Sequence, residues 1–175
     1  MKFDEESDRN IKATTRYCTN NMIKMDAGMA LERVLISAKL EGRITYGVYQ
    51  SVRKLGIIDP QRVMVCLHAD DNADEDVALH IHFTLMEAFC RENSIRLIKV
   101  DCHERLARLL GDTHPTPAAV DNNPTPPAPT RVNTEDFVCL LVDFPKELDD
   151  DDYCFLELYH TLAQEMPFPR ISVAA

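Results

Sequence analysis

Residues 76–93 carry the densest hydrophobic pattern in the chain. At helical spacing the polar side chains of this stretch fall on one narrow stripe, formed by His80, Thr84, Glu87 and Arg91. One apolar face consists of Val77, Ala78, Ile81, Leu85 and Ala88; a second consists of Leu79, Phe83, Met86 and Cys90, with His82 and Phe89 between the faces. A surface helix needs only one apolar stripe, about 100° wide. The pattern therefore predicts a helix that is buried on two sides or packs on another chain.

The two apolar faces predict self-association of the chain. We expect Val77, Ile81 and Leu85 to pack on the chain's own core, which leaves the second face without a cover. The predicted dimer interface is formed by Leu79, Phe83, Met86, Phe89 and Cys90.

Shorter patterns before this helix predict two helices and a strand. Asp26 offers an N-cap to a first helix that Gly42 ends, and Thr45 offers a cap to a second helix that ends at Gly56. The continuous apolar run 63–67 predicts a strand covered on both faces.

The pattern continues after residue 93 in the same alternating order. Residues 95–100 predict a strand, and Asp101 with Glu104 has the spacing of a capping box for a helix over 102–110. A third strand is expected over 137–142, followed by a helix that begins in the acidic run 149–152. Residues 171–173 favour a short edge strand. This alternation is typical of an α/β fold.

The domain organisation follows from where these patterns stop. Residues 1–24 are polar and without a period, which predicts a flexible N-terminal segment. Residues 25–175 are expected to form a single α/β domain. A mobile insertion is predicted at 112–133, because six of the chain's ten prolines lie within it.

An acidic segment leads directly into the central helix. Residues 70–76 hold five carboxylates and no cation, namely Asp70, Asp71, Asp74, Glu75 and Asp76. The simplest interpretation is a solvated turn, with Asn72 and Glu75 at capping-box spacing and the charges favouring the positive end of the helix dipole. Its position at a strand-to-helix junction, where α/β proteins often bind ligands, favours a partner-binding site instead.

The overall composition limits the classes of partner and compartment. A formal charge of −10 repels phosphate backbones, so basic or mixed-charge protein partners are expected and nucleic acid is not. The six cysteines form no CxxC pair, which is typical of reduced cysteines in the nucleus or cytoplasm. No signal-peptide pattern begins the chain and no apolar run reaches the ~18 residues of a membrane span, so no membrane association is expected.

The motifs of enzymes and metal sites are absent from the sequence. All five glycines are isolated, so no phosphate-binding loop is formed. His80 and His82 are two residues apart on a predicted helix and point in different directions, and no zinc-type spacing occurs elsewhere. We therefore expect no catalytic residue, no cofactor and no metal.

Several motifs together resemble one known family. They are residues 45–49 (TYGVY), Asp59-Pro60 before the strand at 63–67, the acidic segment running into residues 76–85 (DVALHIHFTL), residues 88–90 (AFC) with 92–93 (EN), and residues 169–173 (PRISV). This combination resembles the growth arrest and DNA-damage-inducible 45 (Gadd45) family of stress-response regulators. The resemblance implies a three-layer α/β/α sandwich with a mixed central sheet, similar to the L7Ae/L30e-like ribosomal proteins.

The resemblance also implies a function. Members of this family are non-enzymatic adaptors that form homodimers, and one activity is to bind and activate a MAP kinase kinase kinase of p38/JNK signalling, with the acidic segment contacting the kinase. An alternative is an inhibitor or adaptor that binds PCNA and a mitotic cyclin-dependent kinase. A third possibility is RNA binding near residues 45–55, as in the ribosomal relatives, although the residues there do not match the RNA-binding motif.

Overall fold

The described part of the chain folds around one mixed sheet of five strands. The computed structural model describes residues 26–69, 76–111 and 134–173. The strands are β1 (Ile44–Tyr46), β2 (Val63–Ala69), β3 (Leu97–Val100), β4 (Cys139–Asp143) and β5 (Arg170–Ile171). Their order is β1-β4-β2-β3-β5, with β2, β3 and β5 parallel to one another and β4 antiparallel to both its neighbours.

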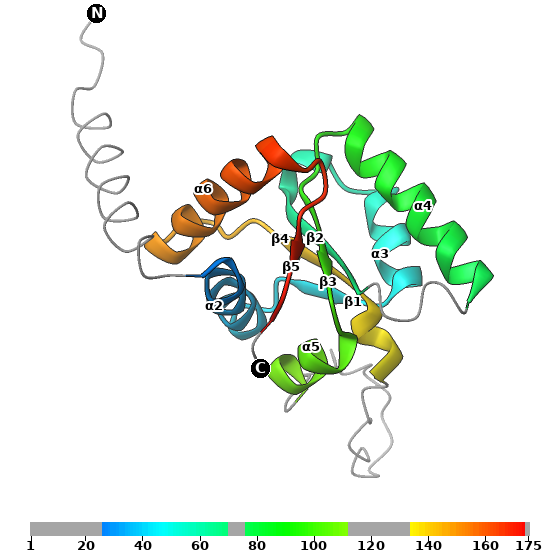
Figure 1. Cartoon of the computed structure of the whole chain (residues 1–175), viewed down its shortest axis with the longest axis horizontal. Coiled ribbons are helices and arrows are strands. Elements are labelled where there is room, and N and C mark those ends of the chain that lie inside the picture. Colours follow the sequence, from blue (N-terminus) through cyan, green and yellow to red (C-terminus); the bar gives the residue numbers. More distant parts are fainter. Residues whose placement is uncertain (1–25, 70–75, 112–133, 174–175) are drawn as a thin grey trace, which may run out of the picture.

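Helices cover both faces of the sheet (Figure 1). One layer contains α2 (Ala27–Leu40), α5 (His103–Leu110) and α6 (Asp150–Glu165), and the other contains α3 (Val48–Leu55) and α4 (Val77–Glu92). Two short 3-10 turns, Pro60–Arg62 and Thr134–Val138, precede β2 and β4. The predicted three-layer α/β/α sandwich is therefore confirmed.

The central strand β2 joins the two cores. All seven of its residues are buried, as the continuous apolar run predicts. Side chains alternate along the strand after Val65, so Leu67 enters the core beneath α2, α5 and α6 and Cys66 the core beneath α3 and α4. An irregularity between Val63 and Val65 interrupts this alternation, so that Met64 shares the core of Leu67 and Val63 the core of Cys66. The five helices α2 to α6 that the structure describes are thus all held by apolar side chains of the same sheet.

The helix caps follow the predictions in part. Asp26 is the N-cap residue of α2, and α6 begins with a capping box in which Asp149 accepts from the Asp152 backbone at 2.8 Å and donates its own N–H to the Asp152 carboxylate at 3.1 Å. The capping box predicted for α5 is wrong. Its N-cap is Cys102, and the Asp101 carboxylate accepts from Arg105 and Ser172 instead.

The prediction that Thr45 caps a helix is also wrong. Thr45 lies in β1, which pairs antiparallel with β4, and Gly47 is the N-cap of α3. The Gly47 N–H donates to the carbonyls of Asp136 at 2.8 Å and Cys139 at 2.9 Å. A strand of three residues is too short to show a period of its own, so only the pairing with β4 reveals it.

The orientation of α4 reverses the predicted assignment of its faces. Phe83, Met86 and Cys90 are 4%, 3% and 0% exposed and pack on the sheet together with the partly buried Leu79 and Phe89. Assigning these five residues to a dimer interface is therefore wrong, because they form the chain's own core. The opposite face lies outside, with Val77 73%, Ile81 52% and Leu85 64% exposed.

Two predicted segments, the flexible N-terminal segment 1–24 and the mobile insertion 112–133, lie outside the described residues, and their predicted character stays a prediction. Across the described part of the chain, no helix combines the length and the apolar character that crossing a bilayer requires.

Candidate partner-binding surface

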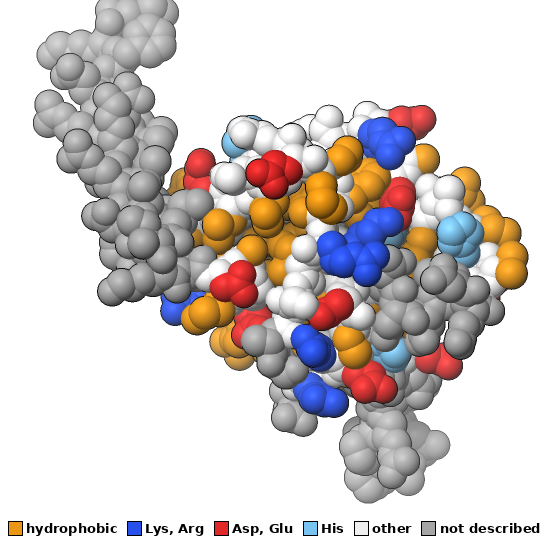
Figure 2. All heavy atoms as spheres, in the orientation of Figure 1, with side chains coloured by type: hydrophobic (Ala, Val, Ile, Leu, Met, Phe, Trp, Pro, Cys, Tyr) orange, Lys and Arg blue, Asp and Glu red, His pale blue; other side chains and the backbone are white. Residues whose placement is uncertain are grey.

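The outward face of α4 is an exposed apolar stripe. Val77, Ile81 and Leu85 follow one another at four-residue intervals along the helix, and all are more than half exposed. Figure 2 shows hydrophobic side chains at the surface where α4 lies in Figure 1, with histidine beside them. We call Val77, Ile81 and Leu85 the α4 stripe.

The start of α4 is set by one member of the acidic segment. Asp76 is its N-cap residue, and its Oδ1 accepts from the backbone N–H groups of Ala78 at 2.9 Å and Leu79 at 3.2 Å. The helix therefore begins at Val77, and the N-cap is not Asn72. Asp76 has a structural role that the spacing of the carboxylates alone did not identify.

The other predicted site residues of the acidic segment are Asp70, Asp71, Asp74 and Glu75, and they lie outside the described residues. The structure describes the two ends of the segment. Residue 69 ends the central strand β2, and residue 76 caps α4. The segment thus connects the carboxyl end of a central strand to the N-terminus of the helix that carries the α4 stripe.

The polar stripe of α4 divides into a paired part and an uncharged part. Glu87 pairs with Lys99 at 2.8 Å, and the Arg91 guanidinium lies 5.3 Å from the centre of the Phe168 ring. Nearer the N-terminus, Thr84 donates to the His80 carbonyl at 2.9 Å. Within the described helix, from Val77 to Glu87, the only carboxylate is thus that of Glu87, which is paired with Lys99.

His80 and His82 do not converge on a common point. His82 Nδ1 lies 2.6 Å from the Ala78 carbonyl oxygen, one turn back along the helix, and both side chains are exposed. His80 is thus exposed, as expected for the polar stripe, and His82, which the pattern places between the two apolar faces, is exposed as well.

Two cations in the region considered for RNA binding are engaged within the chain. Arg43 donates to the Asp143 carbonyl at 2.8 Å, and Lys54 pairs with the Asp143 carboxylate and donates to Thr45 Oγ1 at 3.0 Å. Side chains held in this way are less available to phosphate groups. This geometry adds nothing in favour of an RNA site.

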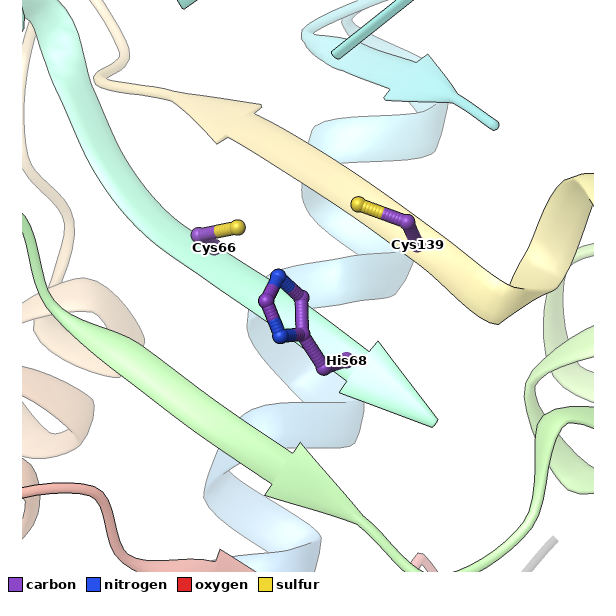
Figure 3. A group of neighbouring side chains, drawn as sticks. All are labelled: Cys66, His68 and Cys139. Carbon is purple, nitrogen blue, oxygen red and sulfur yellow. The ribbon is translucent and has the colours of Figure 1, made fainter. Parts of the chain in front are cut away.

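The structure also assembles a buried cluster that the sequence analysis did not identify. Cys66 and His68 lie on β2, Cys139 lies on β4, and their sulfur and nitrogen atoms all fall within 4.8 Å of one another. Figure 3 shows the three side chains on neighbouring strands, with the His68 ring leaning along β2 toward Cys66. We call Cys66, His68 and Cys139 the Cys–His cluster.

Electrostatics couple the two thiols of the Cys–His cluster. Hydrogen bonding to the Cys66 thiol is the main cause that lowers the pKa of Cys139, and His68 acts in the same direction. Hydrogen bonds with Cys139 and Cys90, together with burial, raise the pKa of Cys66. Cys139 is therefore the first of the two to become a thiolate.

His68 is the least expected member of the Cys–His cluster. It is 1% exposed, its ring stacks on Phe83 with centroids 4.3 Å apart, and neither ring nitrogen has a hydrogen-bond partner among the described residues. A buried polar group without a partner costs about 1 to 3 kcal/mol, so it requires a compensating role. The only signal in the sequence is Cys66 and His68 at two-residue spacing within a buried strand, which places both on one face.

Comparison with known proteins identifies the family. Residues 29–125 match the model of the "Ribosomal protein L7Ae/L30e/S12e/Gadd45 family". The chain is 42% identical over 132 residues to GADD45 beta of Bos taurus, covering 73% of both chains, and 44% identical over 125 residues to GADD45 alpha of Homo sapiens, covering 70% of both. GADD45 gamma of Bos taurus is 46% identical over 96 residues, which are 54% of this chain and 60% of that protein. These relatives are named growth arrest and DNA damage-inducible proteins, and with the L7Ae-type architecture they show that the chain belongs to the Gadd45 family.

Proposed function

We propose that the chain is a non-enzymatic adaptor of the stress response that binds a MAP kinase kinase kinase and activates it by relieving autoinhibition. Family membership supports the general role of a stress-response adaptor linked to DNA damage and growth arrest. The observation that carries the finer proposal is the α4 stripe, exposed on a helix that begins directly after the acidic segment. Its place of action in this proposal is the nucleus and cytoplasm.

The α4 stripe fits a second copy of the same chain. A two-fold contact brings the same patch of both copies together, so the patch must be apolar and free of like charges that would face each other. Among the described residues, the exposed polar side chains beside Ile81 and Leu85 are the uncharged His80, His82 and Thr84, and the carboxylate of Asp76 lies only at the N-terminal end of the stripe, next to Val77. If two α4 helices pack antiparallel about Ile81, their N-termini and the two acidic segments lie at opposite ends of the contact.

The acidic segment fits a basic segment of a kinase. Asp70, Asp71, Asp74 and Glu75 lie together with no cation between them, and Asp76 is already engaged as the cap of α4. Such a cluster speeds the approach of a basic partner and disfavours acidic competitors. The proposed dimer would therefore present one acidic segment at each end of the contact between its two α4 helices.

Ile81→Glu is expected to weaken self-association by about tenfold or more, because each dimer would bury two carboxylates at its centre. The chain should remain folded, since Ile81 is 52% exposed. Sedimentation equilibrium at tens of micromolar measures the effect, and circular dichroism checks the fold.

The matched control for this variant is Ile57→Glu, which makes the same change at an isoleucine 76% exposed outside α4. It should associate like the wild type. A wild-type chain that is only monomeric at tens of micromolar, or equal losses in both variants, would show that the α4 stripe is not a dimer interface.

Changing Asp70, Asp71 and Asp74 together to asparagine is expected to weaken binding of the kinase's basic regulatory segment by roughly tenfold, with most of the difference lost at high salt. Each exposed pair is worth only about 0.2 to 1 kcal/mol, so a single substitution should have little effect. Calorimetry at low and high ionic strength measures both affinities.

A second triple variant, Glu147, Glu157 and Glu165 to glutamine, removes three exposed carboxylates on α6 or just before it, leaves the Asp149 cap in place, and serves as the control for net charge. It should bind the kinase segment like the wild type at low salt. Equal affinity of the loop variant and the wild type would mean that the acidic segment is a solvated turn only.

An alternative function is binding of PCNA or a mitotic cyclin-dependent kinase. An affinity pull-down with the wild type and the acidic-segment variant, analysed by mass spectrometry, separates the alternatives. A MAP kinase kinase kinase that is lost with the variant supports the proposal. PCNA or a cyclin-dependent kinase retained by both proteins, with no upstream kinase, supports the alternative.

A further inference from the structure

We propose that Cys66, His68 and Cys139 bind a Zn²⁺ ion in the core between the sheet and α4. This inference concerns the inside of the domain and does not depend on which partner the surface binds. It replaces the expectation of no metal that followed from the spacing of ligands along the sequence.

The register of β2 and β4 brings the three ligands to one face of the sheet. His68 is paired directly with Cys139, and Cys66 is two residues before His68 on the same strand. Zn²⁺ binds thiolate at about 2.3 Å and imidazole at about 2.0 to 2.1 Å, so tetrahedral ligands lie roughly 3.5 to 3.8 Å apart. Ligand atoms that already fall within 4.8 Å need only small side-chain rotations to reach this geometry.

The chemistry of the three ligands selects the ion. Two thiolates and a neutral imidazole suit Zn²⁺, whereas Mg²⁺ and Ca²⁺ require oxygen ligands, and the Cys–His cluster contains no carboxylate. Two thiolates also cancel the charge of the ion, which favours its burial among apolar side chains.

Coordination would also provide a partner for one buried polar atom that the described core leaves without one. A metal bond would occupy one nitrogen of His68, which has no hydrogen-bond partner among the described residues. The fourth position faces α4, where Met86 Sδ accepts from the Cys139 thiol at 4.0 Å and Cys90 hydrogen-bonds with Cys66. A site closed by protein ligands on all sides is typical of structural zinc.

The test begins with the full chain unfolded in a chelator and a reductant, then refolded with or without Zn²⁺, because the ligands are buried and must be loaded as the core forms. Refolding with zinc should yield about one ion per chain. With free Zn²⁺ at about a hundred times Kd, the Tm should rise by roughly 5 to 10 °C. Refolding with Co²⁺ should give the thiolate-to-cobalt charge-transfer band and the strong visible bands of a tetrahedral site.

His68→Leu is the decisive variant, because it removes one ligand while placing an apolar side chain among apolar neighbours. It should fold, lose stoichiometric zinc and show no zinc-dependent rise in Tm. Cys139→Ala should likewise lose stoichiometric zinc and the zinc-dependent rise in Tm. Cys154→Ala, which changes a buried cysteine on α6, should bind zinc like the wild type.

Three results would overturn the proposal. The first is a wild-type chain that has been refolded in the presence of Zn²⁺ and yet contains almost no zinc. The second is zinc retained in His68→Leu and Cys139→Ala, which would place the ion elsewhere, for instance at surface histidines. The third is a wild-type chain refolded with Co²⁺ whose spectrum lacks the thiolate-to-cobalt bands. Because this measurement uses the wild type alone, it does not depend on whether any variant folds.

Discussion

Replacing Phe83 with alanine is expected to lower the free energy of unfolding by about 3 to 5 kcal/mol, the range for losing a buried aromatic side chain. Phe83 is 4% exposed, packs between α4 and the sheet, and stacks on His68 at a centroid distance of 4.3 Å. Its removal would leave a cavity above the Cys–His cluster. Urea unfolding monitored by circular dichroism measures the loss.

Leu85→Ala is the matched control, because it shortens a large apolar side chain two residues further along the same helix. Leu85 is 64% exposed, so its loss should change the free energy of unfolding of the monomer by less than about 0.5 kcal/mol. If Leu85→Ala costs more than Phe83→Ala in dilute protein, α4 is rotated relative to the structure described above.

Replacing Gly47 with alanine is expected to cost about 2 to 3 kcal/mol. Gly47 has φ 88° and ψ 151°, a region that is almost restricted to glycine and that costs other residues about 1 to 3 kcal/mol. An added Cβ would have room, with the nearest atom 3.5 Å away, so the cost arises from the backbone conformation. The same substitution would also disturb the two hydrogen bonds from the Gly47 N–H to Asp136 and Cys139. Thermal or urea unfolding measures the loss.

Gly56→Ala provides the control at the other end of α3. Gly56 has φ −74° and ψ −11°, which every residue adopts, and an added Cβ would meet only ordinary contacts at 3.6 Å and beyond. This variant should be stabilised by about 0.4 to 1 kcal/mol, because alanine reduces the freedom of the unfolded chain. Equal effects of Gly47→Ala and Gly56→Ala would contradict the turn geometry at Gly47.

The two proposals place different demands on α4. Its outer side, the α4 stripe, is proposed to bind a second copy, while its inner side packs over the Cys–His cluster. Phe83 and Met86 connect α4 to the Cys–His cluster, because both pack on the sheet. Phe83 stacks on His68, and Met86 contacts Cys139. Zinc binding in the core would therefore stabilise the position of the helix that carries the proposed dimer surface.

The sequence by itself determined the class of fold and the family. Continuous apolar runs at β2 and β4, helical periods with caps at Asp26 and Asp149, and the alternation of strand and helix all depend on neighbours close in the chain. These signals held without contacts from distant segments, unlike the caps predicted at Thr45 and Asp101. They therefore sufficed for the α/β class of fold, whereas the three-layer sandwich and the Gadd45 relationship followed from the combination of family motifs, residues 76–85 among them.

Only the tertiary structure decided which face of α4 is buried. Both faces carry enough apolar side chains for either to pack on a core. The periodicity of the sequence therefore permits two rotations of the helix about its axis and does not distinguish between them. What distinguishes them is the surface below, where His68 receives the ring of Phe83 and Cys139 lies against Met86. Those contacts join residues far apart in the chain and leave no periodic trace.

The same reason explains the missed strand β1 and the missed Cys–His cluster. β1 exists because residues 44–46 pair with residues 140–142, and the cluster exists because that sheet places Cys139 opposite His68. In each case the partner is more than 70 residues away along the chain. Local propensity predicts what each segment can form, whereas the pairing of distant segments decides which side chains meet and hence what a site can bind.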